Sequence, residues 1–197
     1  MKRLGYFTLL PLLAVSTSGR TMAGGTPSVL PNRPGPLVNS LYEQVVSRHS
    51  IGVPHGADMD IFGPYLSKAL RERLALNNAC VSDWRRRHPD PNLKPMGVFE
   101  DGLFSGANEQ AEPTRFHLEG IRLGKDGSAQ AYVRLTLDHP PEKPGVWYVA
   151  AAVVSENGHV AVDDILYLKN KKGDVESRLS DRLSSQCDGG RWVGHGQ

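Results

Sequence analysis

AQAYVRLTL at residues 129–137 and VWYVAAAVVSENGHVAVDDILYL at residues 146–168 decide the fold class of this 197-residue chain. In the first stretch, small and apolar residues alternate with polar or aromatic ones, which is the period of a strand with one buried face. In the second, Asn157-Gly158 separates two apolar runs and is the strongest short-range signal for a hairpin. A further run at 115–123 is followed by a turn at Lys125-Asp126-Gly127. Together these runs predict an antiparallel meander.

Helical spacing precedes the strands. Apolar residues between 37 and 46 recur at helical intervals, and Gly52-Val53-Pro54 is expected to end that helix. A second helix is expected after Pro64, with Ser67 as its N-cap, and runs toward Trp84. Helices followed by an antiparallel sheet are typical of an α+β domain. We therefore predict N-terminal helices packed on a curved, cone-like antiparallel sheet.

The domain limits follow from composition. A linker rich in Pro and Gly is expected over 24–36, a single α+β domain over 37–187, and a flexible tail over 188–197. Asp174 is expected to cap a short final helix that ends near Ser185. Residues 89–113 hold prolines and glycines that forbid a long regular element, which makes them the longest irregular stretch of the domain.

Residues 1–23 have the pattern of a secretory signal peptide. Lys2 and Arg3 precede an apolar stretch at 4–15 that is too short to remain as a membrane anchor. Cleavage is expected after Ala23, with Ser18 as the alternative. No Cys stands at the end of the apolar stretch, so no lipoprotein anchor is expected. The sequence therefore predicts a periplasmic or secreted protein without a membrane anchor.

Cleavage also changes the charge of the chain. The full sequence holds 23 Lys and Arg against 21 Asp and Glu, a net charge of +2. Three of the basic residues lie before residue 24, so 20 remain against 21 acidic residues, a net charge of −1. The positive excess that nucleic-acid binding uses is missing, and no nucleic-acid partner is expected. The basic run at 85–88 is interpreted as a solvated helix end.

Cys80 and Cys187 are the only two cysteines. In an exported chain an even number of cysteines favours a disulfide, and a bridge here would close a loop of about 100 residues, worth up to roughly 4.7 kcal/mol in the chain-entropy model. Two separate buried thiols are the alternative. The spacing is not C-x-x-C, so a catalytic redox pair is not expected.

Three stretches carry a resemblance to a known family: GPYLS at 63–67, GLFSG at 102–106 and VAVDDILY at 160–167. In this order they resemble the domain of unknown function 3828 family, exported bacterial proteins similar to the nuclear transport factor 2-like, or cystatin-like, α+β cone. The similarity covers roughly residues 37–183. One departure is His159-Val160, where such strands often carry a Trp. The resemblance implies a concave pocket between sheet and helices, and it brings no established chemistry.

Asp164 is the candidate catalytic residue. It neighbours Asp163 on a predicted strand, so the two carboxylates point to opposite faces. In a regular strand Asp164 shares a face with Val160, Val162 and Leu166, and burial on the concave side would suit it to general-base work. The alternative is a carboxylate that accepts hydrogen bonds near a helix end and only stabilises the fold.

Aromatic residues supply the candidate ligand-binding positions, which are Phe99, Phe104, Trp147 and Tyr167 together with Asp164. One interpretation makes 99–104 the edge of a lid over an apolar pocket and predicts an exposed apolar patch there. The other places these rings in the core under the long loop. The seven histidines show no metal-binding spacing, and no nucleotide fingerprint is present, so neither a metal nor a cofactor is expected.

Three hypotheses about function remain open. The first is a non-enzymatic exported domain that binds a small molecule or a periplasmic protein, and an immunity-type protein that blocks a toxin is one version of it. The second is a small pocket hydrolase or isomerase that uses Asp164 as general base. The third is a structural accessory of the cell envelope without a pocket, which a filled concave face would support.

Overall fold

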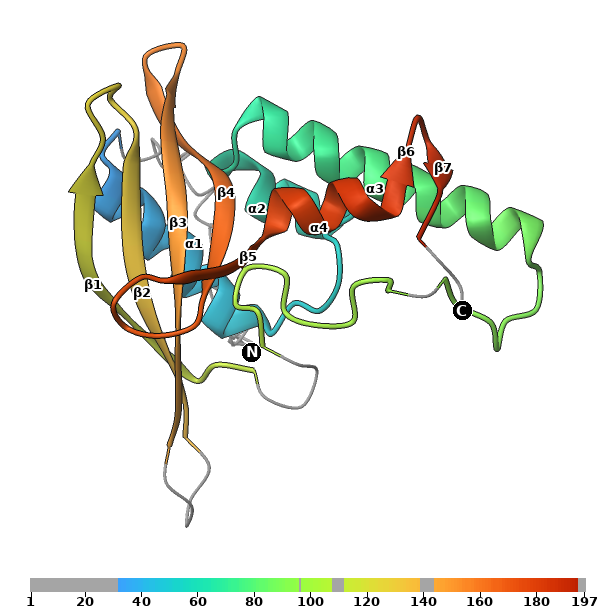
Figure 1. Ribbon diagram of the computed structural model, residues 1–197, viewed down its shortest axis with the longest axis horizontal. Helices are drawn as coiled ribbons and strands as arrows, with labels where there is room; N and C mark the ends of the chain where they lie inside the picture. The colour runs from blue at the N-terminus through green and yellow to red at the C-terminus, as the bar shows by residue number, and fades with distance from the viewer. Residues whose placement is uncertain (1–31, 96, 108–111, 139–143, 195–197) are drawn as a thin grey trace, which may run out of the picture.

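The computed structural model describes residues 32–95, 97–107, 112–138 and 144–194. The chain forms an α+β fold in which helices and an antiparallel sheet share one core (Figure 1). Four elements precede the sheet: α1 (Pro34–Arg48), α2 (Ala57–Phe62), the 3-10 helix η1 (Gly63–Tyr65) and α3 (Lys68–Arg87). The predicted class is confirmed. The expected signal peptide lies outside the described residues, as do most of the linker and the last three residues.

Five strands form the main sheet in the order β1-β2-β3-β4-β5, with every neighbouring pair antiparallel. They are β1 (Arg115–Leu123), β2 (Ala129–Leu137), β3 (Gly145–Glu156), β4 (His159–Leu168) and β5 (Val175–Arg178). The predicted meander is confirmed, as is the β3–β4 hairpin, because Asn157 and Gly158 both have positive φ, at 52° and 82°. The alternation in β2 is confirmed too, since Ala131, Val133 and Leu135 are fully buried.

A β-bulge in β4 overturns one face assignment. Ala152 pairs with Asp164 and Val153 pairs with Val162, so Asp163 is the extra residue. The bulge inverts the alternation along the strand. Val162 before it and Ile165 after it therefore lie in the same main core. The prediction that Asp164 shares a face with Val160 and Val162 is wrong for this reason.

α1 covers one face of the sheet (Figure 1) with buried side chains at Leu37, Val38, Leu41, Tyr42 and Val45. It begins with Pro34 in its first turn, where the missing N–H of proline costs nothing, so it starts inside the expected linker. It ends at Arg48, earlier than predicted. His49 adopts the left-handed conformation and its N–H donates to Val45 O.

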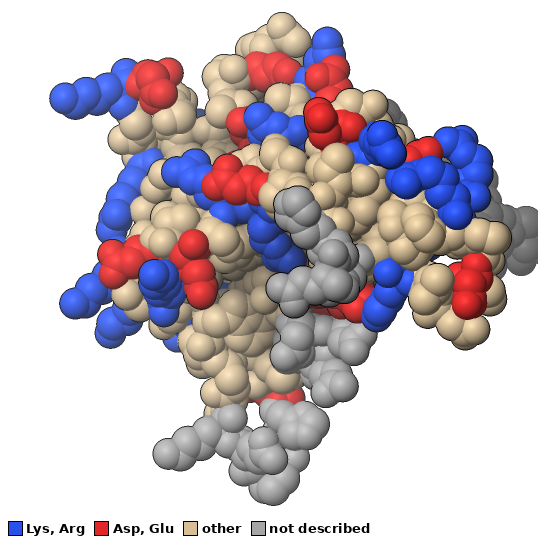
Figure 2. Space-filling model, turned by 45° about the vertical axis from the view of Figure 1, so that its right-hand side comes forward, with Lys and Arg blue, Asp and Glu red and all other residues tan. Residues whose placement is uncertain are grey.

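α3 confirms its predicted N-cap. The Ser67 hydroxyl accepts a hydrogen bond from the Leu70 N–H at 2.9 Å. At the other end the helix finishes with the basic run, where Arg86 and Arg87 both pair with Asp83. On the face drawn in Figure 2, positive and negative side chains are interspersed and neither sign covers the surface alone. None of the helices in the described ranges is long and apolar enough to cross a membrane.

The C-terminal part differs most from expectation. Asp174 does not cap a helix, because residues 175–178 pair with β4 as β5, and α4 (Leu179–Gln186) begins after them. Beyond α4 the chain forms a second hairpin, β6 (Cys187–Asp188) and β7 (Arg191–Trp192). Trp192 is buried, so the predicted flexible tail does not begin at 188. Its indole packs with the Cys80–Cys187 disulfide, whose Cα atoms lie 5.8 Å apart, and this bridge was predicted.

The connection from β4 to β5 covers the outer face of the sheet. In Figure 1 this segment passes over the face opposite α1. Gly173 has a φ of 96°, and a Cβ atom there would lie 2.9 Å from the Tyr132 ring, so only glycine permits this approach. Leu166 and Ala150 are fully buried beneath it. The sheet is therefore packed on both faces over part of its length.

Candidate functional site

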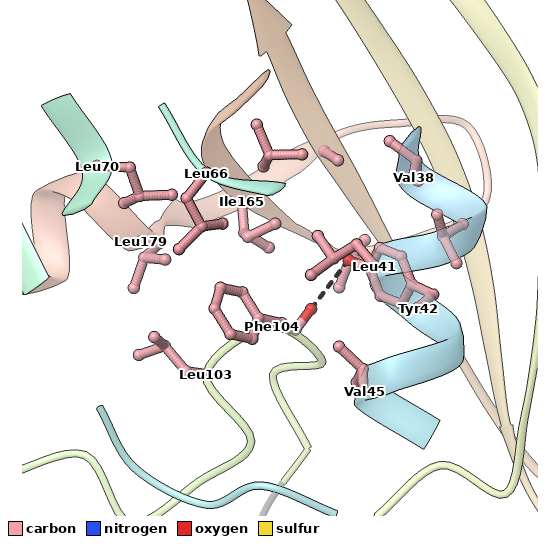
Figure 3. Close-up of a cluster of buried hydrophobic side chains, with 14 of the residues drawn as sticks. Val38, Leu41, Tyr42, Val45, Leu66, Leu70, Leu103, Phe104, Ile165 and Leu179 are labelled. Carbon is pink, nitrogen blue, oxygen red and sulfur yellow. Dashed lines mark hydrogen bonds between the residues drawn. The ribbon is translucent and has the colours of Figure 1, made fainter. Parts of the chain in front are cut away.

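Residues 102–107, here called the inner loop, lie inside the molecule between the sheet and the helices. Leu103 and Phe104 are 1% and 3% exposed. Figure 3 shows the Phe104 ring between the apolar face of α1 and a group of leucines, and Leu103 beside Leu179 of that group. The leucines are Leu66, Leu70 on α3 and Leu179 on α4. The Phe104 ring packs against Phe62 with the ring centroids 5.0 Å apart. The inner loop thus fills the space where the family resemblance implies a concave pocket, which is the observation named above in support of an envelope accessory. A binding site, if the chain has one, lies outside this space.

Three aromatic side chains fix the inner loop by its backbone. The Tyr167 hydroxyl donates to Leu103 O at 2.7 Å, the Tyr42 hydroxyl to Phe104 O at 2.9 Å, and the Trp147 indole N–H to Ser105 O at 2.9 Å. The donors come from β4, α1 and β3, so successive carbonyls are tied to three separate elements. Buried carbonyl groups need such partners, and these bonds make the loop part of the core.

Burial also keeps the two tyrosines in their donor form. The pKa of Tyr42 and that of Tyr167 are both raised well above the ordinary value, chiefly because burial disfavours the charged phenolate. Gly106 is required beside them. Its φ is +67°, and a Cβ atom there would lie 2.7 Å from the Tyr167 ring. The second glycine of the GLFSG motif is therefore needed for the loop to pack against the Tyr167 ring.

An open cleft of about 300 Å³ lies beside the inner loop, and we call it the aromatic cleft. Its lining includes Gly106, Ala107, Trp147, Tyr148, Tyr167 and Glu176. The polar ends of Trp147 and Tyr167 are occupied by the inner loop. Among the described residues that line it, Glu176 is the one ionisable acid or base apart from the tyrosines. The described part of the cleft combines ring surface with the exposed carboxylate of Glu176.

Asp164 stabilises the start of α4. Its Oδ1 accepts hydrogen bonds from the Ile165 N–H at 2.9 Å and from the Ser180 N–H at 3.0 Å, and its Oδ2 accepts from the Ser180 hydroxyl at 2.7 Å. The residue at the N-cap position, Arg178, makes no side-chain capping bond. Asp164 supplies that missing acceptor from the neighbouring strand. The geometry matches the structural alternative, since both carboxylate oxygens are engaged.

Asp163 performs the corresponding task for α3. Its carboxylate accepts from the Ser67 hydroxyl at 2.5 Å, and Ser67 is the cap of that helix. The adjacent aspartates therefore serve two different helix starts. The sequence predicted that the two carboxylates do not form a pair, and they do not. The reason differs from the predicted one, because the β-bulge at Asp163, and not regular alternation along the strand, directs them to different helices.

Phe99 joins the same region through Arg182. The Arg182 guanidinium lies 4.4 Å from the centroid of the Phe99 ring and 5.3 Å from that of Tyr167. It also pairs with Asp101 Oδ2 at 2.9 Å. Phe99 and Phe104 are buried, so the exposed apolar patch predicted for 99–104 is wrong. The Phe104 ring lies in the core because the inner loop folds inward, and the Phe99 ring is buried next to the Arg182 guanidinium.

Glu112 is a polar feature that the sequence did not indicate. Both of its carboxylate oxygens are buried and have no hydrogen-bond partner within the described part of the chain. They lie against Gly102, where a Cβ atom would be 3.0 Å from Oε1. Burial, and after it the negative charge of Asp101, raises the pKa of Glu112. A glutamate in a loop of prolines and polar residues carries no sequence signal for this.

The described ranges contain no group of three or more His, Cys, Asp or Glu side chains placed to hold a metal ion. Comparison of the chain with protein-family models, with curated proteins and with solved structures gave no match. The inner loop and the clefts around it are therefore the features from which a function can be inferred.

Proposed function

We propose that this protein is an exported, non-enzymatic binding domain that holds a small ligand in the aromatic cleft. The observation that carries the proposal is the state of Trp147 and Tyr167. Their polar atoms are bound to the inner loop, so the surface that they leave to the cleft is ring surface. Trp147 is half-buried and provides most of it, because Tyr167 is 8% exposed. Glu176 adds one exposed carboxylate. Ring surface and a carboxylate suit a flat apolar ligand that carries a cationic group.

The proposal also includes the cone-like fold that the family resemblance implies. In this fold the inner loop occupies the concave space between sheet and helices. The ligand then binds at the edge of that space, in the aromatic cleft, where Ser105, Gly106 and Ala107 meet β3 and β4. Export is supported by the signal-peptide pattern at 1–23 and by the Cys80–Cys187 disulfide, which suits an oxidising compartment. A protein partner, including the immunity-type version, is the competing form of this hypothesis.

The hydrolase or isomerase hypothesis loses its support in the geometry of Asp164. A general base needs a free lone pair within reach of substrate. The Asp164 carboxylate instead accepts three hydrogen bonds from Ile165 and Ser180. We therefore do not propose a reaction for this residue.

Native mass spectrometry of the protein purified from the periplasm or medium of its own cells tests the proposal. We expect a small-molecule adduct on the wild-type chain and on Glu43→Lys, because Glu43 is exposed on α1 and does not line the cleft. Glu176→Lys should lose the adduct, because it places a cation where the ligand carries one. A bare wild-type mass, or equal retention by the two variants, would overturn the proposal. A co-purifying protein without an adduct would replace it with the protein-partner hypothesis.

A further inference from the structure

A second cleft, of about 280 Å³, lies between α3 and the loop that precedes α2, and we infer that it binds a small amphipathic carboxylate. We call it the Arg85 cleft. Apolar side chains of its lining include Ile51, Val53 and Val81, and the polar ones include Asn77, Ser82 and Arg85. It shares no lining residue with the aromatic cleft, so this inference is independent of the proposed function.

Arg85 supplies the charge. Within the described ranges it makes no ion pair, whereas its neighbours Arg86 and Arg87 both pair with Asp83. No Asp or Glu is among the lining residues of the cleft, and His55 is its other basic group. The charged and ionisable side chains that line the cleft are therefore all basic, and the Arg85 guanidinium is available for a bidentate contact with a carboxylate.

Asn77 supplies an unused acceptor. The residue is 1% exposed and lines the cleft, and its Oδ1 has no hydrogen-bond partner among the described residues. Its Nδ2 donates to Gln186 Oε1 at 3.4 Å. A buried carbonyl without a donor is unfavourable, so a ligand hydroxyl or N–H placed here would satisfy it.

The spacing of these two groups defines the shape of the ligand. Asn77 and Arg85 lie eight residues apart on α3, which corresponds to about 12 Å along the helix axis. Apolar side chains lie with them along the cleft, among them Val81 on the same helix. The fitting ligand is a medium-chain acid with a hydrogen-bond donor at the end opposite its carboxylate.

The walls of the Arg85 cleft are held in place without a ligand. Asn78 Nδ2 donates to Pro54 O at 2.9 Å, and the Gly52 N–H donates to Asp101 O at 2.9 Å. Gly52 has a φ of +77°, and a Cβ atom there would lie 3.2 Å from Phe99 O, so the loop approaches closely. On the helical wall, Cys80 is bridged to Cys187. A preformed site loses little conformational entropy on binding.

Isothermal titration calorimetry of the purified protein with 8-hydroxyoctanoate tests the inference. Octanoate lacks the donor, and 1,8-octanediol lacks the charge. We expect the hydroxy acid to bind roughly fivefold more tightly than octanoate, as one hydrogen bond allows. The diol should bind at least tenfold more weakly than the hydroxy acid. Backbone amide shifts should change around Gly52 and Ser82 when the hydroxy acid is added.

Arg85→Gln and Arg86→Gln form a matched pair of variants, because both lie on the exposed end of α3 and only Arg85 lines the cleft. Arg85→Gln should weaken the hydroxy acid at least tenfold and leave the diol unchanged, while Arg86→Gln should change neither. No binding at millimolar concentration would overturn the inference. Equal losses in the two variants, or a diol that binds as tightly as the acid, would overturn it too. None of these outcomes affects the aromatic cleft.

Discussion

The sheet half of the molecule and the far end of α3 achieve stability by different means. Around the sheet, α1, the inner loop and α4 share one large core in which Phe104 and Leu103 are almost fully buried. Toward the far end of α3, where β6 and β7 lie in Figure 1, the described residues form a small cluster around Trp192 and the Cys80–Cys187 disulfide. A cluster of this size buries little apolar area, so a covalent link replaces packing. Each half carries one of the two clefts at its edge.

Phe104→Ala should have the largest effect on this comparison. It removes a buried ring from the sheet half and opens a cavity, which typically costs about 3–5 kcal/mol in the free energy of unfolding. Chemical denaturation monitored by circular dichroism measures the change. Leu93→Ala is the control, because Leu93 is 53% exposed and should change stability by less than about 0.5 kcal/mol. A Phe104→Ala protein as stable as this control would mean that the inner loop is not part of the core.

Removal of the disulfide should come second. The double variant Cys80→Ser with Cys187→Ser should lower the free energy of unfolding by about 3 kcal/mol, because the bridge joins residues 107 positions apart. The loss of the disulfide should first increase local opening near the site of the bridge. Hydrogen exchange should accelerate in the second half of α3 and in β6–β7, while β2 and β3 keep their protection. Uniform acceleration across both halves would show that they unfold as one unit, which would contradict a separate source of stability at the far end of α3.

Asp164→Asn should have a smaller effect, about 1–2 kcal/mol, because an amide cannot accept all three hydrogen bonds that the carboxylate accepts at the start of α4. The variant should fold and retain the cleft ligands. Ser180→Ala, which removes the hydroxyl partner, should give a loss of similar size, and the double variant should lose less than the sum. If the losses in unfolding free energy of the two single variants add up exactly in the double variant, Asp164 does not act through Ser180, and the capping role would be contradicted.

Glu112→Gln should have the smallest effect at acid pH and should change the pH dependence. Because its pKa is raised in the folded state, protonated Glu112 contributes stability below the ordinary carboxyl pKa, and this contribution is lost as the pH rises through the raised value. The wild-type protein should therefore lose more stability than Glu112→Gln between acid and neutral pH. Thermal melts over this range compare the two, with Glu43→Gln as the exposed control. Parallel curves would contradict a buried carboxyl at this position.

Local patterns predicted much of the sheet half. The alternation of β2, the turn at Asn157-Gly158 and the cap at Ser67 depend on residues close in sequence, and all three were confirmed. The bulge at Asp163 was missed because a twofold period gives no sign of one extra residue. Asp174 was misassigned because the pairing of β5 with β4 is tertiary and leaves no pattern in VESR.

The candidate site was predictable only in part. Phe104, Trp147 and Tyr167 were named from sequence. Trp147 and Tyr167 line the aromatic cleft and donate to the inner loop, whereas the Phe104 ring packs on Phe62 in the core and does not line the cleft. Their use as donors to that loop, and the burial of Glu112, depend on contacts between distant segments. The C-terminal hairpin did leave a signal, because Gly189-Gly190 separates two short runs and both glycines have positive φ.

Hydrogen exchange of the inner loop shows whether residues 102–107 belong to the core. The Gly102 N–H donates to Ala107 O, and the Ser105 N–H donates to Gly102 O, in a segment that three aromatic donors fix to the core. If the inner loop is part of the core, its hydrogen-bonded amides, those of Gly102, Ser105 and Gly106, should exchange as slowly as those of β2 and β3 and more slowly than those of β6–β7. Exchange at the rate of an exposed loop would contradict the account, because residues 102–107 would then open and leave the space between sheet and helices free.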